Sequence, residues 1–344
     1  MPGRKLNIPR GYRSAVGPFS VRCGRSAGSA GAYGGSVRFS ISIPQFVSDG
    51  FDDTGMKSYL ARAEELGFEG GWTMEQIVGN STAIAPLQLL SYAAACTTRL
   101  RLGVAVLITS LHDPLQLAAA ITAVDHLSHG RLDVGVGHGG KRRPFAAFGV
   151  APETFISYFT EGIELMKAAW SDEPTVTFHG QFRDVDGLAI QPKPVQRPHP
   201  PLWIGGTAPK ALARGVWMAD AFLGAGASTT ATFAEAVKTV RRELDEEGKD
   251  ATRFTIGKRV YLMIDDDADR ARQRVLDGLH RIYDDIRGIE DVPVSGTPDD
   301  VARGLREVMD AGAEMILLNP VGATVAEDRE QMERLAAEVL PQLR

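Results

Sequence analysis

The chain has few cysteines and no long hydrophobic run. Its 344 residues include only two cysteines, Cys23 and Cys96. Two cysteines cannot form a disulfide framework, and because neither lies in a CxxC pair, a cysteine-rich zinc site is excluded as well. No run of about 18 apolar residues occurs, so no membrane-spanning helix is expected. The formal net charge of −5 argues against a nucleic-acid-binding protein.

Composition sets the first 36 residues apart from the rest. They contain six basic residues and no acidic one, so all 43 acidic residues lie in the remainder. This stretch is rich in Gly, Ser and Arg and has no hydrophobic period, so it cannot bury enough apolar surface to fold alone. It also lacks the apolar core of a secretory signal. We therefore predict a disordered basic tail over residues 1–36, a single folded domain over residues 37–344 and a cytoplasmic location.

Strand and helix patterns alternate along residues 37–344. Short β-rich or apolar runs are followed by amphipathic stretches that carry helix start and stop signals. The predicted strands are residues 37–46, 70–76, 100–110, 131–137, 201–206, 220–225, 254–265 and 313–320. The predicted helices are residues 56–68, 81–98, 113–130, 153–171, 209–219, 230–247, 268–287, 298–312 and 325–343. Residues 172–200 interrupt this rhythm and are typical of a β-hairpin followed by a Pro-rich loop.

Eight strand–helix units predict the fold class. Alternating units of this kind form a parallel sheet, and eight of them favour a (β/α)8 TIM barrel, here with an insertion between the fourth helix and the fifth strand. The alternative is a doubly wound sheet, which usually carries GxGxxG after its first strand, and PQFVSDGF has no such pattern. In a barrel the functional residues lie where the strands end.

The second and fourth strands end in residues that can carry chemistry. Glu75 can act as an acid or a base, and Gln76 can only donate and accept hydrogen bonds. A carboxylate bonded to a neighbouring backbone amide is the structural alternative for Glu75. After the fourth strand, Gly137 and Gly139 leave room for a flat ligand, and His138 is the best placed of the seven histidines for proton transfer. The alternative there is a flexible turn.

Features that can bind anions follow the fourth and fifth strands. Gly206 and Thr207 precede a helix, so backbone amides and a hydroxyl group can hold a phosphate there. Lys141, Arg142 and Arg143 can hold a phosphate or carboxylates beside the barrel mouth, although their pattern alone favours a solvated loop.

The third and seventh strands offer fewer candidate functional residues. Residues 105–109, at the end of the third strand, include no acid, base or metal ligand, so their pattern alone indicates core. In the seventh strand Lys258 and Arg259 point to opposite faces, so one of them is expected to face inward. The HExxH, GxSxG and P-loop motifs are absent.

Five stretches within residues 37–344, in order along the chain, resemble the luciferase-like superfamily of flavin- and deazaflavin-dependent oxidoreductases, whose members are (β/α)8 barrels. They include ARAEELGFEGGWTMEQ, the segment from TRLRLGVAVLITS to LDVGVGHG, and PLWIGGTAPKALARGVWMADAFL. FSISIPQF and GTPDDVARGLREVMDAGAEMILLNP complete the set. The tail has no counterpart.

The resemblance implies three cofactor contacts. It places a bulge with a non-proline cis peptide near Ala105–Val106, where it would support the cofactor ring. It places the turn from Gly137 through His138 to Gly139 along the flavin, and Gly206 with Thr207 at the cofactor phosphate. It also suggests that Phe46, Phe145 and Phe148 wall an apolar substrate space.

One position departs from the family. Many relatives end the second strand with an acid followed by His, whereas this chain has Glu75 and Gln76. Glutamine cannot titrate, so Glu75 or His138 would have to supply any proton. The VGVGHG turn resembles members that use coenzyme F420, a deazaflavin, and Lys141 and Arg142 suit its anionic tail. FMN is the alternative cofactor.

The resemblance therefore implies an oxidoreductase that transfers a hydride between coenzyme F420 and a small organic substrate. The first alternative is an FMN-dependent monooxygenase that uses O2 and a partner reductase. The second is a non-catalytic flavin or deazaflavin carrier, and the third is a metal-free aldolase or isomerase that binds a substrate phosphate at Thr207. By analogy the chain is expected to form a homodimer.

Overall fold

The structure of the protein is a computed structural model that describes residues 37–46, 50–76, 82–139, 145–283 and 288–344. The predicted tail over residues 1–36 and the cationic residues Lys141, Arg142 and Arg143 lie outside these ranges. Within the described residues no helix is long and apolar enough to cross a membrane.

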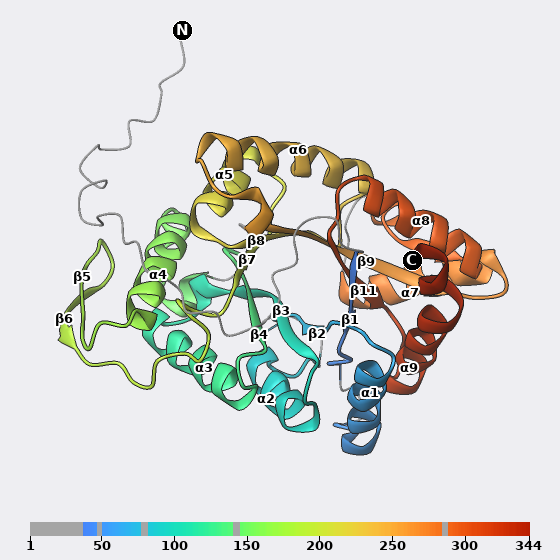
Figure 1. The fold of residues 1–344 in the computed structure, drawn as a ribbon, viewed down its shortest axis with the longest axis horizontal. Coiled ribbons are helices and arrows are strands. Elements are labelled where there is room, and N and C mark those ends of the chain that lie inside the picture. The colour runs from blue at the N-terminus through green and yellow to red at the C-terminus, as the bar shows by residue number, and fades with distance from the viewer. Residues whose placement is uncertain (1–36, 47–49, 77–81, 140–144, 284–287) are drawn as a thin grey trace, which may run out of the picture. The chain divides into compact units, whose positions relative to one another are not determined.

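Eight parallel strands form the closed barrel that the sequence predicts (Figure 1). The sheet runs from β1 through β2, β3, β4 and β7 to β8, and it closes because β8 pairs with β9, β9 with β11 and β11 with β1. The strands are β1 (Arg38–Ser42), β2 (Gly70–Thr73), β3 (Arg101–Ile108), β4 (Leu132–Gly137), β7 (Leu202–Ile204), β8 (Ala221–Gly224), β9 (Thr255–Ile264) and β11 (Met315–Pro320).

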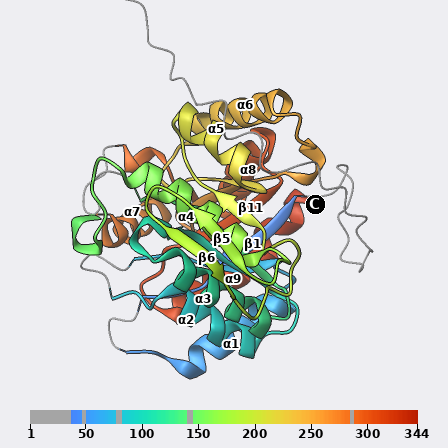
Figure 2. The same cartoon turned by 90° about the vertical axis from the view of Figure 1, so that its left-hand side faces the viewer.

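Helices surround these strands (Figures 1 and 2). They are α1 (Asp53–Glu65), α2 (Pro86–Cys96), α3 (Pro114–Leu127), α4 (Phe155–Trp170), α5 (Pro209–Met218), α6 (Thr230–Glu246), α7 (Ala268–Ile282), α8 (Pro298–Asp310) and α9 (Val325–Arg334). Sequence signals explain where they begin. Asp113, for example, accepts from the amides of Leu115 and Gln116 and so caps α3, with Pro114 in the first turn.

Two short elements connect or extend the barrel. The predicted hairpin is confirmed as β5 (Val176–His179) and β6 (Asp184–Leu188), which lie between α4 and β7. A three-residue strand that the sequence pattern missed, β10 (Val294–Gly296), pairs with the carboxyl end of β9. The predicted last helix is also shorter than expected, because regular α-helix ends at Arg334 and a π-helical turn follows over Leu335–Val339.

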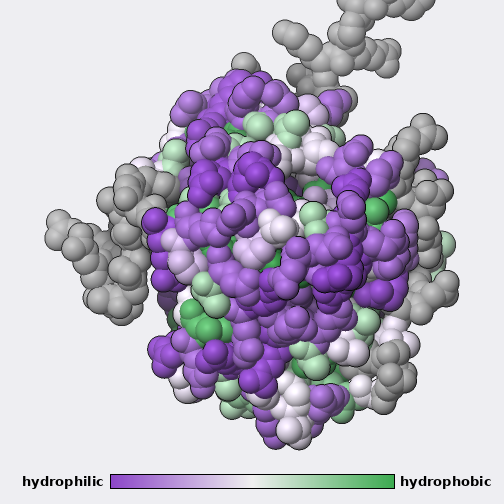
Figure 3. All heavy atoms as spheres, turned by 90° about the vertical axis from the view of Figure 1, so that its right-hand side faces the viewer, coloured by the Kyte–Doolittle hydropathy of each residue, from purple (hydrophilic) through white to green (hydrophobic). Residues whose placement is uncertain are grey.

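The outer helices turn charged faces to solvent and apolar faces to the sheet. In α7 the buried residues are Ala271, Val275, Gly278 and Leu279, a spacing of three to four residues. Figure 3 shows the side of the barrel where α7, α8 and α9 lie, and its spheres are mostly hydrophilic. The main core therefore lies between these helices and the strands.

A second, smaller core fills the barrel itself. The indole rings of Trp72 and Trp203 meet edge to face with their centroids 5.3 Å apart, and residues of three further strands, β3, β8 and β11, pack around them. Gly103 makes room for Trp72, because a Cβ added there would lie 2.1 Å from its Cδ2 atom. The barrel is thus plugged in its middle, and its two ends are separate environments.

Paired charges close the amino end of the barrel. Arg38 Nη1 lies 2.7 Å from Glu69 Oε1, and Arg101 Nε lies 2.7 Å from Asp133 Oδ2. The indole Nε1 of Trp203 donates to Asp133 Oδ1 at 3.2 Å. The Arg101–Asp133 ion pair therefore holds the indole ring of Trp203, and with it the core inside the barrel, from the amino end.

Candidate functional site

The carboxyl end of β3 is irregular. The register between β3 and β4 shifts between Val104 and Leu107, and the Ala105–Val106 peptide bond is cis. Both the bulge and the cis peptide that the family resemblance predicts are confirmed. Arg259, which reaches across from β9, donates from Nη2 to the carbonyl oxygen of Ala105 at 2.6 Å.

Val106 packs against the backbone of two neighbouring strands. A Cβ added to Gly137 would lie 2.8 Å from Val106 Cγ2, and one added to Gly135 would lie 3.2 Å from Val106 Cγ1. The corresponding distance for Gly205, after β7, is 3.8 Å. These glycines let β4 and β7 approach the bulge, so packing explains them as well as the space for a ligand that the sequence suggests. Val106 of β3 and Gly137 of β4, two of the predicted cofactor residues, therefore lie against each other, and Gly205, which precedes the predicted Gly206, lies beside them.

The turn after β7 leads directly into α5. Gly206 and Thr207 precede the helix, whose N-cap residue Ala208 provides no side-chain acceptor for the first-turn amides. Arg214 lies further along α5 and is half-buried, and this burial lowers the pKa of its guanidinium group. A polar backbone turn and a cation thus stand on one side of the bulge.

His138 lies between this turn and α4. Its ring contacts Phe155 and Phe159 edge to face, with centroid distances of 5.3 and 6.0 Å. Burial in these surroundings is the main cause that lowers the pKa of His138, and the positive charge of Arg214 adds to it. The imidazole is therefore neutral near pH 7.

Glu75 has a partner that the sequence analysis missed. Its side chain is only 1% exposed, and Oε1 lies 2.6 Å from Nε2 of His112, whose side chain is 26% exposed. The other oxygen accepts from the backbone amide of Ile108. Glu75 therefore also makes the bond to a neighbouring backbone amide that the sequence analysis gives as its structural alternative. Because β2 and β3 are neighbours, residues that follow them meet at the barrel mouth, and this adjacency could have pointed to His112. Gln76 makes no hydrogen bond to another described residue.

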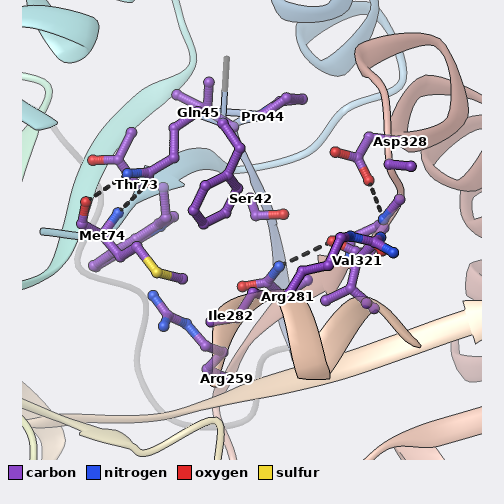
Figure 4. Close-up of a pocket in the computed structure, with 18 of the residues that line it drawn as sticks. Ser42, Pro44, Gln45, Thr73, Met74, Arg259, Arg281, Ile282, Val321 and Asp328 are labelled. Atoms are coloured by element: carbon purple, nitrogen blue, oxygen red, sulfur yellow. Dashed lines mark hydrogen bonds between the residues drawn. The ribbon is translucent and has the colours of Figure 1, made fainter. Parts of the chain in front are cut away.

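A cavity of about 350 Å³ opens at the same end of the barrel (Figure 4). Its walls come from the ends of β1, β2 and β11, from the middle of β9, and from helices α7 and α9. The apolar part of the lining consists of Ile43, Phe46, Trp72, Met74, Ile282 and Val321. Gln45 holds the β1 and β2 ends together, because its side-chain amide donates to the carbonyl oxygen of Met74 at 2.8 Å and accepts from the amide of Met74 at 2.6 Å.

The three predicted wall aromatics lie in different surroundings. Phe46 is 41% exposed and lines the cavity. Phe145 is buried and stacks on Phe155 with the ring centroids 4.9 Å apart. Phe148 is exposed on a neighbouring turn. Among the described residues, only Phe46 of these three borders the cavity.

Polar groups line the side of the cavity near β9, β11 and α9. The predicted division of Lys258 and Arg259 is confirmed, since Arg259 faces the cavity while Lys258 donates to Ser228 and Ala225 outside it. Asp328 is half-buried, its Oδ1 accepts from the amide of Gly322 at 2.9 Å, and desolvation of its carboxyl group raises its pKa to about 7. No cluster of metal-ligating side chains occurs in the part of the chain that the structure describes.

This closed barrel is a TIM barrel, with a bulged third strand and a cavity at the end where TIM barrels place their functional sites. The family model for luciferase-like monooxygenases matches residues 37–338. The chain belongs to this family.

Curated relatives include both reductases and oxygenases. The chain is 22% identical to a 5,10-methylenetetrahydromethanopterin reductase of Archaeoglobus fulgidus, over 84% of this chain and 96% of that protein. It is 28% identical to the oxygenase component of a flavin-dependent trigonelline monooxygenase of Acinetobacter baylyi, over 43% and 41% of the two chains. Matches of 31% and 40% identity to uncharacterized proteins of Sinorhizobium fredii and Mycobacterium bovis cover about two fifths of those proteins, 43% and 42%.

Solved structures share the fold at low identity. Monooxygenase RslO1 from Streptomyces bottropensis is 23% identical and superposes with a TM-score of 0.77, covering 89% of this chain and all of that one. An F420-dependent secondary alcohol dehydrogenase, solved with an F420-acetone adduct, is 18% identical with a TM-score of 0.75, covering 90% and 99%. Members with this fold thus include both kinds of enzyme.

Proposed function

We propose that the protein is an oxidoreductase that transfers a hydride between coenzyme F420 and a small organic substrate. The observation that carries this proposal is the arrangement around Val106, where the ends of β3, β4 and β7 form an apolar seat next to a cavity at the barrel mouth. The fold shared with an F420-dependent alcohol dehydrogenase, over almost the whole of that chain, supports it.

The residues present suit a flat cofactor with an anionic side chain. Val106 and the glycine backbone opposite it offer an apolar surface without side chains in the way. The uncapped start of α5 and the half-buried Arg214 suit a phosphate. The proposed cofactor-binding residues are Ala105, Val106, Gly137, His138, Gly139, Gly206, Thr207 and Arg214, with Lys141 and Arg142, outside the described residues, proposed for the anionic tail.

The cofactor supplies the carbon that gives or takes the hydride, and the chain supplies orientation and proton handling. Glu75 is almost fully buried, whereas His112 is partly exposed and lies 2.6 Å from it. A proton that moves between Glu75 and the barrel mouth therefore passes through His112. We propose that this pair takes the place of the titratable histidine that Gln76 replaces, with His138 beside the cofactor as a neutral hydrogen-bonding group.

An FMN-dependent monooxygenase with a partner reductase is the second candidate. The match to the oxygenase component of trigonelline monooxygenase favours it. Reduced FMN would then require a separate reductase and would react with O2, which the deazaflavin does not. A non-catalytic carrier is the candidate from another class.

Separate titrations with coenzyme F420 and FMN distinguish these candidates. We expect the full-length protein to bind F420 at least about tenfold more tightly than FMN, followed by fluorescence. Tight binding of FMN alone would overturn the cofactor assignment, and binding of neither would overturn the function. Binding of F420 without turnover of any alcohol or carbonyl compound would indicate a carrier.

Glu75→Gln tests the proton pair, and Glu161→Gln is its matched control. Glu161 is also a buried carboxylate that accepts from backbone amides, those of Gln181 and Arg183, but it lies on α4 against the hairpin. We expect Glu75→Gln to lower turnover about 100-fold while cofactor binding is retained. Glu161→Gln should leave turnover within about threefold of the parent. Parent-level turnover in Glu75→Gln would exclude Glu75 from proton transfer.

A further inference from the structure

Two buried polar atoms that line the cavity have no partner among the described residues. They belong to Arg259 and Asn319, which are 8% and 6% exposed and both line the cavity. The Nε of Arg259 and the Oδ1 of Asn319 form no hydrogen bond within the part of the chain that the structure describes. A buried donor or acceptor without a partner is disfavoured, so an unpaired donor and an unpaired acceptor that line one cavity point to a ligand that satisfies both.

Arg259 also has no counterion among the described residues. The side-chain hydrogen bond that it does make there runs from Nη2 to an uncharged acceptor, the carbonyl oxygen of Ala105. Asp328 is the one acidic residue in the described lining, yet it forms no ion pair with Arg259 and accepts from the amide of Gly322 instead. A buried guanidinium group without a carboxylate partner is costly, and an anionic ligand would supply that partner.

Arg259 and Asn319 lie on the same inward face of adjacent strands. Arg259 pairs in register with Leu317, and Asn319 lies two residues further along β11. The side-chain amide of Asn319 already donates to the carbonyl oxygen of Pro320 at 3.0 Å, which leaves its oxygen as the free acceptor. Figure 4 shows Arg259 on the side of Met74 and Arg281 near Val321. Arg281, which is exposed, donates to the carbonyl oxygen of Val321 and adds a second positive charge at the rim.

We propose that the cavity binds a small organic acid with a hydroxyl group, the carboxylate on Arg259 and the hydroxyl donating to Asn319. A planar carboxylate can accept from Nε and the adjacent Nη of one guanidinium group, which matches the geometry of the free donor. The apolar lining, including Trp72 and Ile43, takes the hydrocarbon part. The proposal that such an acid is a substrate rests on the proposed function, whereas the proposal that the cavity binds it does not.

Three ligands with one skeleton test the two contacts. Mandelate carries both groups, styrene glycol replaces the carboxylate by CH2OH, and phenylacetate lacks the hydroxyl. We measure their affinities for the full-length protein by calorimetry, before any cofactor is added. At about pH 6 the ligand acids are ionised and the raised pKa of Asp328 keeps its carboxyl group mostly neutral. Mandelate is expected to bind at least about tenfold more tightly than either of the other two ligands.

Variants assign the preference to the two residues. Arg259→Met is expected to abolish the preference for mandelate over styrene glycol and to leave styrene glycol binding unchanged. Asn319→Leu is expected to abolish the preference over phenylacetate. If Arg259 only supports the β3 bulge through Ala105, its loss would weaken all three ligands alike, and this would overturn the proposal.

Further measurements keep the two proposals separate. Arg259→Lys is the second variant, in case Arg259→Met does not fold. It retains a cation but not the two parallel donors, so it should keep part of the mandelate preference. Equal affinities of the parent for the three ligands, or a full preference in folded Arg259→Met, would overturn the organic-acid proposal. Failure to bind F420 and FMN would overturn the proposed function and leave a mandelate preference standing.

Discussion

The two ends of the barrel differ in how their charged residues are satisfied. At the amino end Asp133 accepts from both Arg101 and the indole of Trp203. At the carboxyl end Arg259 and Asn319 are buried to a similar degree, and each has a polar atom without a partner among the residues that the structure describes. The ion pair at the amino end stabilises the core around Trp72 and Trp203. The unpaired polar groups at the carboxyl end are instead available to bind a ligand.

This difference separates stability from function within one barrel. A residue whose partners are all in the chain contributes to folding, and a residue whose partner is missing contributes to binding at a cost in stability. The hydrogen bonds at the amino end are not complete either, because Glu69 Oε2 is buried and bonds to no described residue. Substitutions at matched positions should show which end carries which role.

Asp133→Ala should have the largest effect on stability. It leaves the guanidinium group of Arg101 and the indole N–H of Trp203 without their acceptor, and the side chain of Arg101 is only 31% exposed. We expect the free energy of unfolding to fall by about 2–4 kcal/mol, measured by urea denaturation. Cofactor affinity should not change, because the plug separates the two ends.

Arg259→Met is the counterpart at the other end. It removes a buried charge that has no counterion and loses one hydrogen bond, to Ala105. These effects oppose each other, so the stability change should stay below about 1 kcal/mol. A larger loss of stability in Arg259→Met than in Asp133→Ala would contradict the division between the two ends.

Two glycines offer an intermediate test. A Cβ on Gly103 would lie 2.1 Å from the ring of Trp72, whereas a Cβ on Gly137 would lie 2.8 Å from one methyl group of Val106. Trp72 is held by Trp203, while Val106 is only partly buried and can shift. We expect Gly103→Ala to cost about 2 kcal/mol in urea denaturation and Gly137→Ala less than about 1 kcal/mol.

Cofactor titration of the same glycine variants should give the opposite order. Gly137→Ala displaces the surface proposed to hold the cofactor ring, so we expect F420 affinity to fall about tenfold. Gly103→Ala should bind F420 like the parent. Unchanged F420 affinity in Gly137→Ala, with a folded protein, would argue that the ring is held elsewhere.

Sequence patterns were sufficient for the barrel because each strand–helix unit carries its own signals. They missed β10, because its residues Val294–Gly296 have only one large apolar side chain, whereas the equally short β7 is apolar throughout. The β3 bulge was predicted from the family resemblance, because the pattern of residues 105–109 alone indicates core. The eight barrel strands were therefore predictable from local patterns, and their irregularities were not.

The candidate site was harder to predict because its contacts join distant residues. Glu75 and His112 are 37 positions apart, and their pairing depends on how two loops fold after neighbouring strands. The alternation of Lys258 and Arg259 predicts opposite faces, but which one faces inward depends on the register of β9 against β11. The second carboxylate oxygen of Glu75 accepts from the amide of Ile108, and this contact too depends on how the ends of β2 and β3 fold.

His138 provides the smallest expected effect and a pH-dependent test of the carboxyl end. Burial against Phe155 and Phe159, with Arg214 nearby, lowers its pKa below the ordinary value of 6.5. Below pH 6.5 the unfolded chain therefore takes up a proton that the folded chain does not, and stability is lost as the pH falls through this window.

We expect His138→Gln to remove that loss of stability toward low pH in urea denaturation series from about pH 5 to pH 8. His126→Gln is the control, because His126 is exposed on α3. An unchanged pH slope in His138→Gln would place the acid-sensitive group elsewhere. A slope removed by His138→Gln alone would show that the uncompensated carboxyl end, and not the ion-paired amino end, makes the fold sensitive to mild acid.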